Sequence, residues 1–130
     1  MSDSSIKLPH ITEVAITKAK ELLAFSTLPY YQVGGNLTEA EDAVVIGDVV
    51  AWDATAKKWI NYLFGGSGDE ILAIGFVRIP GDPTDGDVAI EVVVGGAVKY
   101  SVVSVASNWN AAVITDLKAR YIEAADALIF

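Results

Sequence analysis

Short apolar runs that alternate with turn residues fill the chain from residue 44 to residue 105, and they constrain the fold more than any other feature. Each run is rich in β-branched and aromatic residues, which suit the half-buried surface of a pleated sheet. The runs cover residues 44–46, 49–52, 59–64, 71–79, 88–94 and 98–105. Glycine, aspartate and proline separate them, as in segments 65–68 and 80–87. Many short strands at this spacing predict a small β-barrel or a sandwich-like domain.

The two ends of the chain differ from this central pattern. Residues 1–10 are mostly polar and cannot bury themselves, so they are predicted to form an extended N-terminal arm. Residues 11–25 fit both a helical and an alternating pattern, and we expect a short strand that runs into a turn of helix. Residues 110–127 carry one apolar stripe at helical spacing, which predicts a short C-terminal helix. The apolar residues 128–130 are expected to be packed, as a final strand.

One turn and the number of domains complete the predicted fold. Gly34-Gly35-Asn36 follows Tyr31 and Val33, and this combination predicts a tight turn because glycine and asparagine tolerate positive φ values. A chain of 130 residues is near the usual size of one domain. We therefore predict a mainly β fold with two parts, the arm at 1–10 and a single β-rich domain at 11–130.

Composition narrows the classes of function. The chain has 9 Lys and Arg against 17 Asp and Glu, a formal charge of -8, which repels phosphate backbones and anionic lipid. Neither nucleic acid nor a membrane is expected as a partner. The chain lacks cysteine, which excludes disulfides and thiolate chemistry. The first residues do not form a secretory signal, and no run reaches the roughly 18 apolar residues of a membrane span.

Residues that could carry chemistry are few. His10 is the sole histidine and lies in the predicted arm, where the fixed geometry of a catalytic triad is hard to maintain. Asp82, Asp85 and Asp87 lie in one loop and could bind calcium, but their spacing differs from that of an EF-hand and also suits an ordinary turn. We expect the turn and no metal or other cofactor.

Two further motifs resemble catalytic elements only in part. Residues 65–68, Gly-Gly-Ser-Gly, lack the Lys-Ser or Lys-Thr that follows the glycines of a P-loop, so a hairpin tip is expected. Asp69 and Glu70 are adjacent, and adjacent strand residues point to opposite faces, so they would not flank one glycosidic bond. The sequence therefore favours a protein that is not an enzyme.

The aromatic residues leave an alternative open. They could line a carbohydrate- or peptide-binding platform, because aromatic rings give a large contact area at low entropic cost. Packing in the core or at a subunit interface is the favoured interpretation. The residues concerned are Trp52, Trp59, Trp109, Tyr30, Tyr31 and Tyr62.

The order of several motifs between residues 14 and 129 resembles that of a known family. The motifs are Val14-Ala15-Ile16-Thr17 with Leu22-Leu23-Ala24 and Leu28-Pro29, Gly47-Asp48-Val49-Val50-Ala51 with Trp59, Ala73-Ile74-Gly75-Phe76-Val77, the apolar stretch 89–98, and Leu117-Lys118-Ala119-Arg120-Tyr121-Ile122. In this order they are similar to the lambda-type head decoration proteins of tailed bacteriophages. The chain differs from that pattern at Tyr121, where members often have glycine, and in its extra residues 123–130.

The resemblance implies a structural role. It implies a homotrimer at the local threefold sites of an expanded phage head, which stabilises the shell against internal DNA pressure without chemistry. The protein would be assembled in the host cytoplasm and reside on the outer capsid surface of the virion, with the major capsid protein and its own copies as partners. The arm would pair with a sheet edge of the capsid protein. Ile6, Leu8, Pro9 and Ile11 are the expected contacts.

Overall fold

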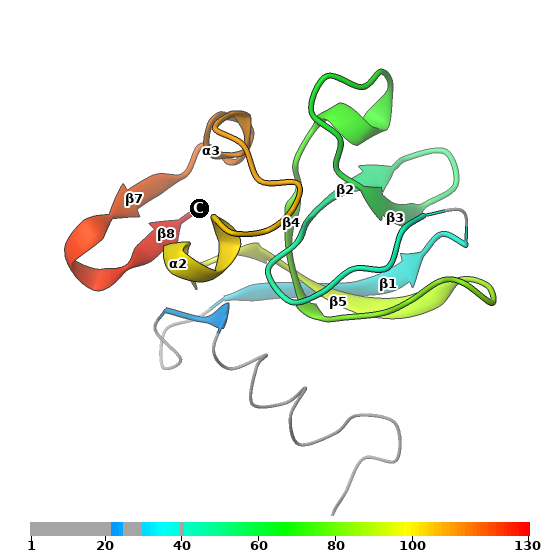
Figure 1. Cartoon of the computed structure of the whole chain (residues 1–130), viewed down its shortest axis with the longest axis horizontal. Coiled ribbons are helices and arrows are strands. Elements are labelled where there is room, and N and C mark those ends of the chain that lie inside the picture. The colour runs from blue at the N-terminus through cyan, green and yellow to red at the C-terminus, as the bar shows by residue number, and fades with distance from the viewer. Residues whose placement is uncertain (1–21, 25–29, 40) are drawn as a thin grey trace, which may run out of the picture.

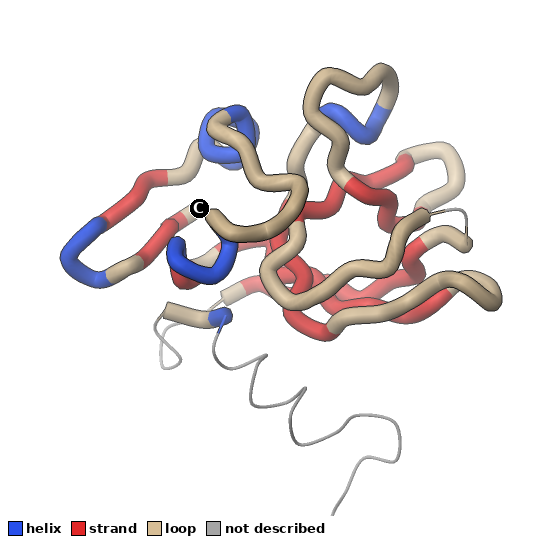
Figure 2. Tube along the Cα trace, in the orientation of Figure 1, coloured by secondary structure: helices blue, strands red, loops and turns tan. Residues whose placement is uncertain are grey.

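The chain folds into a closed β-barrel with a smaller sheet beside it (Figure 1). The structure is a computed structural model that describes residues 22–24, 30–39 and 41–130. Among the described residues, more belong to strands than to helices, and the helices are short (Figure 2). The mainly β fold class predicted from the sequence is confirmed.

Five strands close the barrel in the order β1-β3-β2-β4-β5. They are β1 (Tyr31–Leu37), β2 (Val49–Asp53), β3 (Lys58–Asn61), β4 (Gly75–Ile79) and β5 (Val88–Gly95). β5 pairs antiparallel with β1 and β4, and β2 pairs antiparallel with β3 and β4. The seam between β1 and β3 is parallel and rests on one pair, Leu37 with Trp59. The pairing of β1 with β5 is the longest in the barrel, whereas β2 and β4 share only two residue pairs and this seam only one.

The smaller sheet follows the barrel in the chain and has the order β6-β8-β7. Its strands are β6 (Ala97–Lys99), β7 (Arg120–Ile122) and β8 (Ala127–Ile129). Two short helices, α2 (Tyr100–Val103) and α3 (Ala112–Leu117), lie between β6 and β7. Two 3-10 turns, η2 (Asp69–Ile71) and η3 (Glu123–Ala125), precede β4 and β8.

Two hydrophobic clusters fill the interior. One joins the barrel to the smaller sheet, since it contains Val49 and Phe76 together with Val98 and Leu128. Leu22 is fully buried in the same cluster, and Leu23 forms a bridge with Val98. The second cluster lies within the barrel, around Leu37, Trp59 and Val92. The first cluster is therefore a core that the barrel and the smaller sheet share.

The prediction of a tight turn at Gly34-Gly35-Asn36 is wrong, because β1 continues through these residues and pairs with β5 along its length. The glycines serve close packing instead of a turn. A β carbon built on Gly35 would lie 2.9 Å from Nε1 of Trp59, whose indole N–H has no hydrogen-bond partner among the described groups. The indole thus occupies the space that a side chain at residue 35 would need.

The C-terminal helix predicted for residues 110–127 is only partly correct. Helix α3 ends at Leu117, because Lys118 takes a left-handed conformation and its N–H returns to the carbonyl groups of Ile114 and Thr115. The chain then forms β7 and η3. The final strand expected at residues 128–130 is confirmed by β8.

Several predicted strands differ in length from the observed ones. The run 98–105 contributes only the end of β6 and then forms α2. The run 71–79 begins in η2 and becomes a strand only at Gly75, and the run 59–64 leaves β3 after Asn61. In the run 44–46, Val44 makes one isolated bridge with Gly81. The predicted arm at 1–10 and most of the segment 11–25 lie outside the described residues.

Gly75 provides a test of the barrel packing. A β carbon at this position would lie 2.3 Å from the carbonyl oxygen of Val93 and 2.8 Å from Cγ1 of Val92, so β4 and β5 would have to separate. Gly75→Ala should lower the free energy of unfolding by about 1–3 kcal/mol or more, measured by urea denaturation. Gly34→Ala is the matched control, since its added carbon meets only the movable carboxylate of Glu91. Equal losses in the two variants would contradict this packing.

Candidate functional site

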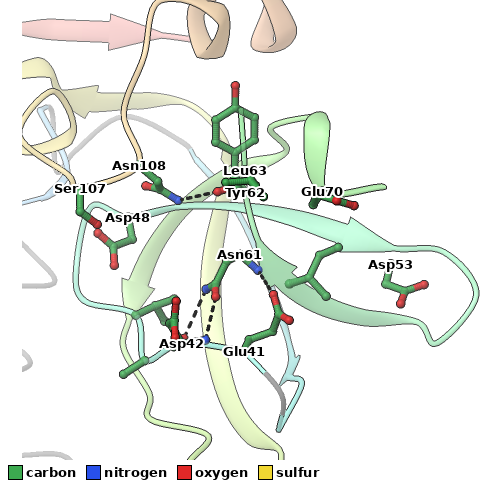
Figure 3. Close-up of a pocket in the computed structure, with 13 residues that line it drawn as sticks. Glu41, Asp42, Asp48, Asp53, Asn61, Tyr62, Leu63, Glu70, Ser107 and Asn108 are labelled. Carbon is green, nitrogen blue, oxygen red and sulfur yellow. Dashed lines mark hydrogen bonds between the residues drawn. The ribbon is translucent and has the colours of Figure 1, made fainter. Parts of the chain in front are cut away.

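A polar groove of about 600 Å³ lies between the segment before β2, the end of β3 and the loop after α2 (Figure 3). Its described lining includes no lysine, arginine or histidine. Five carboxylates lie along it: Glu41, Asp42, Asp48, Asp53 and Glu70. The groove is therefore unsuited to an anionic ligand.

The carboxylates of this groove stabilise backbone turns. Glu41 Oε1 accepts the N–H of Asn61 at 2.7 Å, and Asp53 Oδ1 accepts the N–H groups of Thr55 and Ala56. Most described carboxylates are used in this way; those that accept a backbone N–H are Glu41, Asp48, Asp53, Asp69, Glu70, Asp82, Asp87, Asp116 and Asp126. The groove is therefore acidic largely because its carboxylates accept backbone N–H groups and so hold nearby loops in place.

Asn108 holds one wall of the groove to the barrel (Figure 3). Its Oδ1 accepts the N–H of Val49 at 3.1 Å, and its Nδ2 donates to the carbonyl groups of Val49 at 2.7 Å and Tyr62 at 3.3 Å. Val49 is fully buried. The side chain therefore satisfies the buried N–H of Val49 and gives its C=O a shorter hydrogen bond than the one from the N–H of Tyr62, at 3.4 Å.

Removing this amide should be strongly destabilising. Asn108→Ala leaves the buried N–H of Val49 without a partner and leaves its C=O with only the N–H of Tyr62 at 3.4 Å, so the free energy of unfolding should fall by about 1–3 kcal/mol in urea denaturation. Asn36→Ala, at an exposed position of β1, should change it by less than about 0.5 kcal/mol. A loss at Asn108 as small as that of the control would show that water replaces the amide.

Asp48 is the one buried acidic residue of the groove, with 8% of its surface exposed. Its Oδ2 accepts the N–H of Val45 at 2.9 Å, which closes the turn before β2. Burial raises the pKa of Asp48, and the hydrogen bond from Val45 offsets this only in part. The folded protein therefore binds the Asp48 proton more tightly than the unfolded chain does.

This shift predicts how stability depends on pH. The contribution of Asp48 is fully present below the unfolded pKa and is lost as the pH rises through the higher folded pKa. Asp48→Asn should therefore raise the free energy of unfolding at about pH 7, and the gain should vanish below about pH 4.

Asp87 supplies the opposite case for comparison. Its pKa is lowered, first by Lys58, whose ammonium group is paired with it, and then by the N–H of Glu39. Asp87→Asn should therefore reduce stability at about pH 7 and not at low pH. Urea denaturation of both variants at the two pH values checks the two signs, and a shift of equal sign for both would contradict the assignment.

The loop of Asp82, Asp85 and Asp87 is a turn, as predicted. Asp82 accepts hydrogen bonds from the N–H and the hydroxyl of Thr84, which lower its pKa, while Asp87 faces Lys58 and Glu39. The carboxylates are thus directed to different partners. Among the described residues there is no group of three histidine, cysteine or acidic side chains that could bind a metal ion.

The segment 65–68 is a loop but not the tip of a hairpin between paired strands, because β2 lies between β3 and β4. The carboxylate of Glu70 accepts the N–H of Ser67, and so occupies the backbone donor that a phosphate cradle would offer. Asp69 and Glu70 lie in η2 and not on a strand. Asp69 binds the N–H of Ala54, so the two carboxylates act at different loops.

Most of these aromatic residues pack in the two hydrophobic clusters, but Tyr31 belongs to neither and is 75% exposed. Trp52 packs edge to face against buried Trp59, with ring centroids 4.8 Å apart, in the barrel cluster. Trp109 packs against Phe76 and Tyr100 in the shared cluster, which also buries Tyr62. This distribution fits the favoured core interpretation and does not form one aromatic strip.

The expected arm contacts Ile6, Leu8, Pro9 and Ile11 lie outside the described residues, as does His10.

The sequence interpretation missed an exposed apolar surface. Four large side chains, Leu63, Phe64, Ile71 and Leu72, are between 48% and 66% exposed in the loop between β3 and β4. We call them the 63–72 patch. Ile71 and Leu72 also border a hollow that includes Trp52 and Ile74. The sequence did contain one sign of this exposure. Adjacent residues of a strand point to opposite faces, so the two members of each apolar pair could not both be buried on one face.

No helix among the described residues has the length and apolar character to cross a membrane. Comparison of the sequence with models of known protein families and with curated proteins gives no match.

Proposed function

We propose that this chain is a structural protein that decorates the outer surface of an expanded tailed-phage head, as trimers at local threefold sites. In this role it binds the major capsid protein and its own copies and stabilises the shell against internal pressure. The proposal rests on the order of sequence motifs and on the mainly β fold, and it involves no catalysis.

The exposed 63–72 patch is the observation that carries the proposal. A small domain that functions alone seldom presents four large apolar side chains of one loop to water, because their burial is favourable. Such a patch is typical of surfaces that bind another protein. The polar groove offers no comparable binding surface, since most of its carboxylates already hold backbone N–H groups.

The arm supplies the second part of the proposed attachment. Ile6, Leu8, Pro9 and Ile11 are the apolar residues of an otherwise polar segment, and a short extended segment can add as a strand to the sheet edge of another protein. We assign capsid contact to these four residues. A second contact by the folded domain would add to that of the arm and strengthen attachment.

Co-sedimentation with capsids tests the proposal. The purified chain should bind expanded, undecorated heads of the cognate phage saturably, and should bind unexpanded heads much less. A variant in which Ile6, Leu8 and Ile11 are all changed to serine should retain its fold and self-association, but its binding should fall at least tenfold, which corresponds to about 1.4 kcal/mol.

The matched control changes Ser2, Ser4 and Ser5 to alanine, which alters the arm without removing apolar side chains. This control should bind heads as the unmodified chain does. Absence of binding to any cognate head would refute decoration and would direct attention to a carbohydrate- or peptide-binding role. Full binding by the serine variant would refute the role of the arm and would leave decoration itself in place.

A further inference from the structure

One edge of β1 is largely unpaired in the part of the chain that the structure describes. β1 pairs with β5 from Tyr31 to Leu37, but toward β3 it makes a single pair, Leu37 with Trp59. Residues 31–36 are exposed, apart from half-buried Gly35. The edge of β1 that faces β3 is therefore accessible over most of its length, and an accessible edge can accept a further strand.

This open edge presents the backbone groups of alternate residues. The N–H of Thr38 donates to the carbonyl group of Trp59 at 3.2 Å, so the backbone of the even-numbered residues of β1 faces the β3 side. By the same alternation, Gln32 and Gly34 direct their N–H and C=O groups to this side, where no described residue pairs with them. A strand placed at this edge would give these groups hydrogen-bond partners.

The open edge also leaves an inward-facing apolar side chain uncovered. Val33, Gly35 and Leu37 share one face of β1 because alternate residues of a strand do so. That face is the interior one, since Leu37 is fully buried and Gly35 lies against the indole rings of Trp52 and Trp59. Val33 is nevertheless 44% exposed. The strand that fits this edge therefore places an apolar side chain beside Val33.

Residues 13–17 of the chain itself have this pattern. In extended conformation, Val14 and Ile16 lie on one face, and Glu13, Ala15 and Thr17 lie on the other. The apolar face would cover the interior side of β1, and the polar face would meet solvent. A helical conformation of the same residues would leave them no free backbone groups with which to pair.

The described chain enters the fold near the start of β1. Leu23 bridges to Val98, three positions beyond Gly95, and Gly95 is the partner of Tyr31. Three positions of a strand span about 10 Å. Residues 22–24 accordingly lie at the end of the barrel where β1 begins (Figure 1). Residues 18–21 can cross about 13 Å when extended, so a turn there would bring the preceding residues alongside β1 in the antiparallel direction.

We infer that residues 13–17 add to the open edge of β1 of the same copy as an antiparallel strand, with Ile16 opposite Val33 and Val14 opposite Gly35. This register pairs the free backbone groups of β1 and covers its exposed interior face. The N-terminal arm then leaves the domain beside the seam between β1 and β3. The inference does not depend on the proposed decoration, and neither of its tests involves capsids.

Engineered disulfides test the register, because the chain has no cysteine of its own. Opposite residues of an antiparallel pair have Cα atoms about 4.5–5.5 Å apart, which a disulfide can join. The variant with Ile16→Cys and Val33→Cys should form a disulfide within one molecule under mild oxidation. It should do so at least tenfold faster than the control with Ile16→Cys and Phe64→Cys. Phe64 is 66% exposed, in the loop on the side of the barrel away from β1 (Figure 1).

Two outcomes of the disulfide experiment would overturn the inference. Equal rates in the two double variants would show that Ile16 has no preferred place beside Val33. A mixture of the two single variants, Ile16→Cys and Val33→Cys, should form disulfide-linked dimers at least tenfold more slowly than the double variant closes. Equally fast formation of dimers would assign the added strand to a second copy.

Hydrogen exchange provides an independent measurement on the full chain. Changing Val14 and Ile16 to aspartate should raise the exchange rate of the Gly34 N–H at least tenfold, because the added strand is lost. Changing Ile6 and Leu8 to aspartate is the matched control and should leave that rate unchanged. Circular dichroism identifies a variant that fails to fold, and serine then replaces aspartate at the same positions. An unchanged rate in the folded Val14 and Ile16 variant would overturn the inference.

Discussion

The passage of β5 into β6 across Gly96 is the constraint on which both parts of the domain depend. β5 pairs with β1 and β4 in the barrel, and two residues later β6 begins the smaller sheet. At the junction Gly96 has a φ of 126°, open to glycine but strained for other residues, and it exchanges two backbone hydrogen bonds with Phe130. Phe130 thus holds the backbone at this junction. The shared core cluster contains Val93 and Val98, one from each side of Gly96.

The local sequence pattern was sufficient to predict those strands in which burial and strand propensity agreed. β2 and β5 are short, rich in β-branched residues and bounded by turn residues, and they lie close to their predicted positions. It failed where a distant contact set the local conformation. Gly35 lies in a strand because Trp59, far along the chain, fills the space beside it. α3 stops at Lys118 because the following residues pair with β8, which the helical stripe could not reveal.

The candidate surfaces were less predictable than the fold. The Asp82–Asp87 loop was correctly predicted as a turn, since its residue types specify one directly. The 63–72 patch was not predicted, because an apolar run in sequence is read as buried unless its neighbours are known. Only the placement of β2 between β3 and β4 makes the connecting loop long and leaves its apolar residues outside the barrel. The exposure of these apolar residues therefore follows from the strand order and not from the composition of the loop.

The acidity of the domain is a by-product of the way its turns are closed. Asp53, Asp69 and Glu70 hold the N–H groups of neighbouring loops, and similar bonds recur around the barrel. Replacing such residues to make the protein less negative would open loops as well as remove charge. A variant with a higher isoelectric point is better obtained by adding lysine or arginine than by deleting acids. The exceptions are Glu39, Asp42, Asp85, Glu91 and Glu123, since no backbone N–H of the described residues donates to their carboxylates.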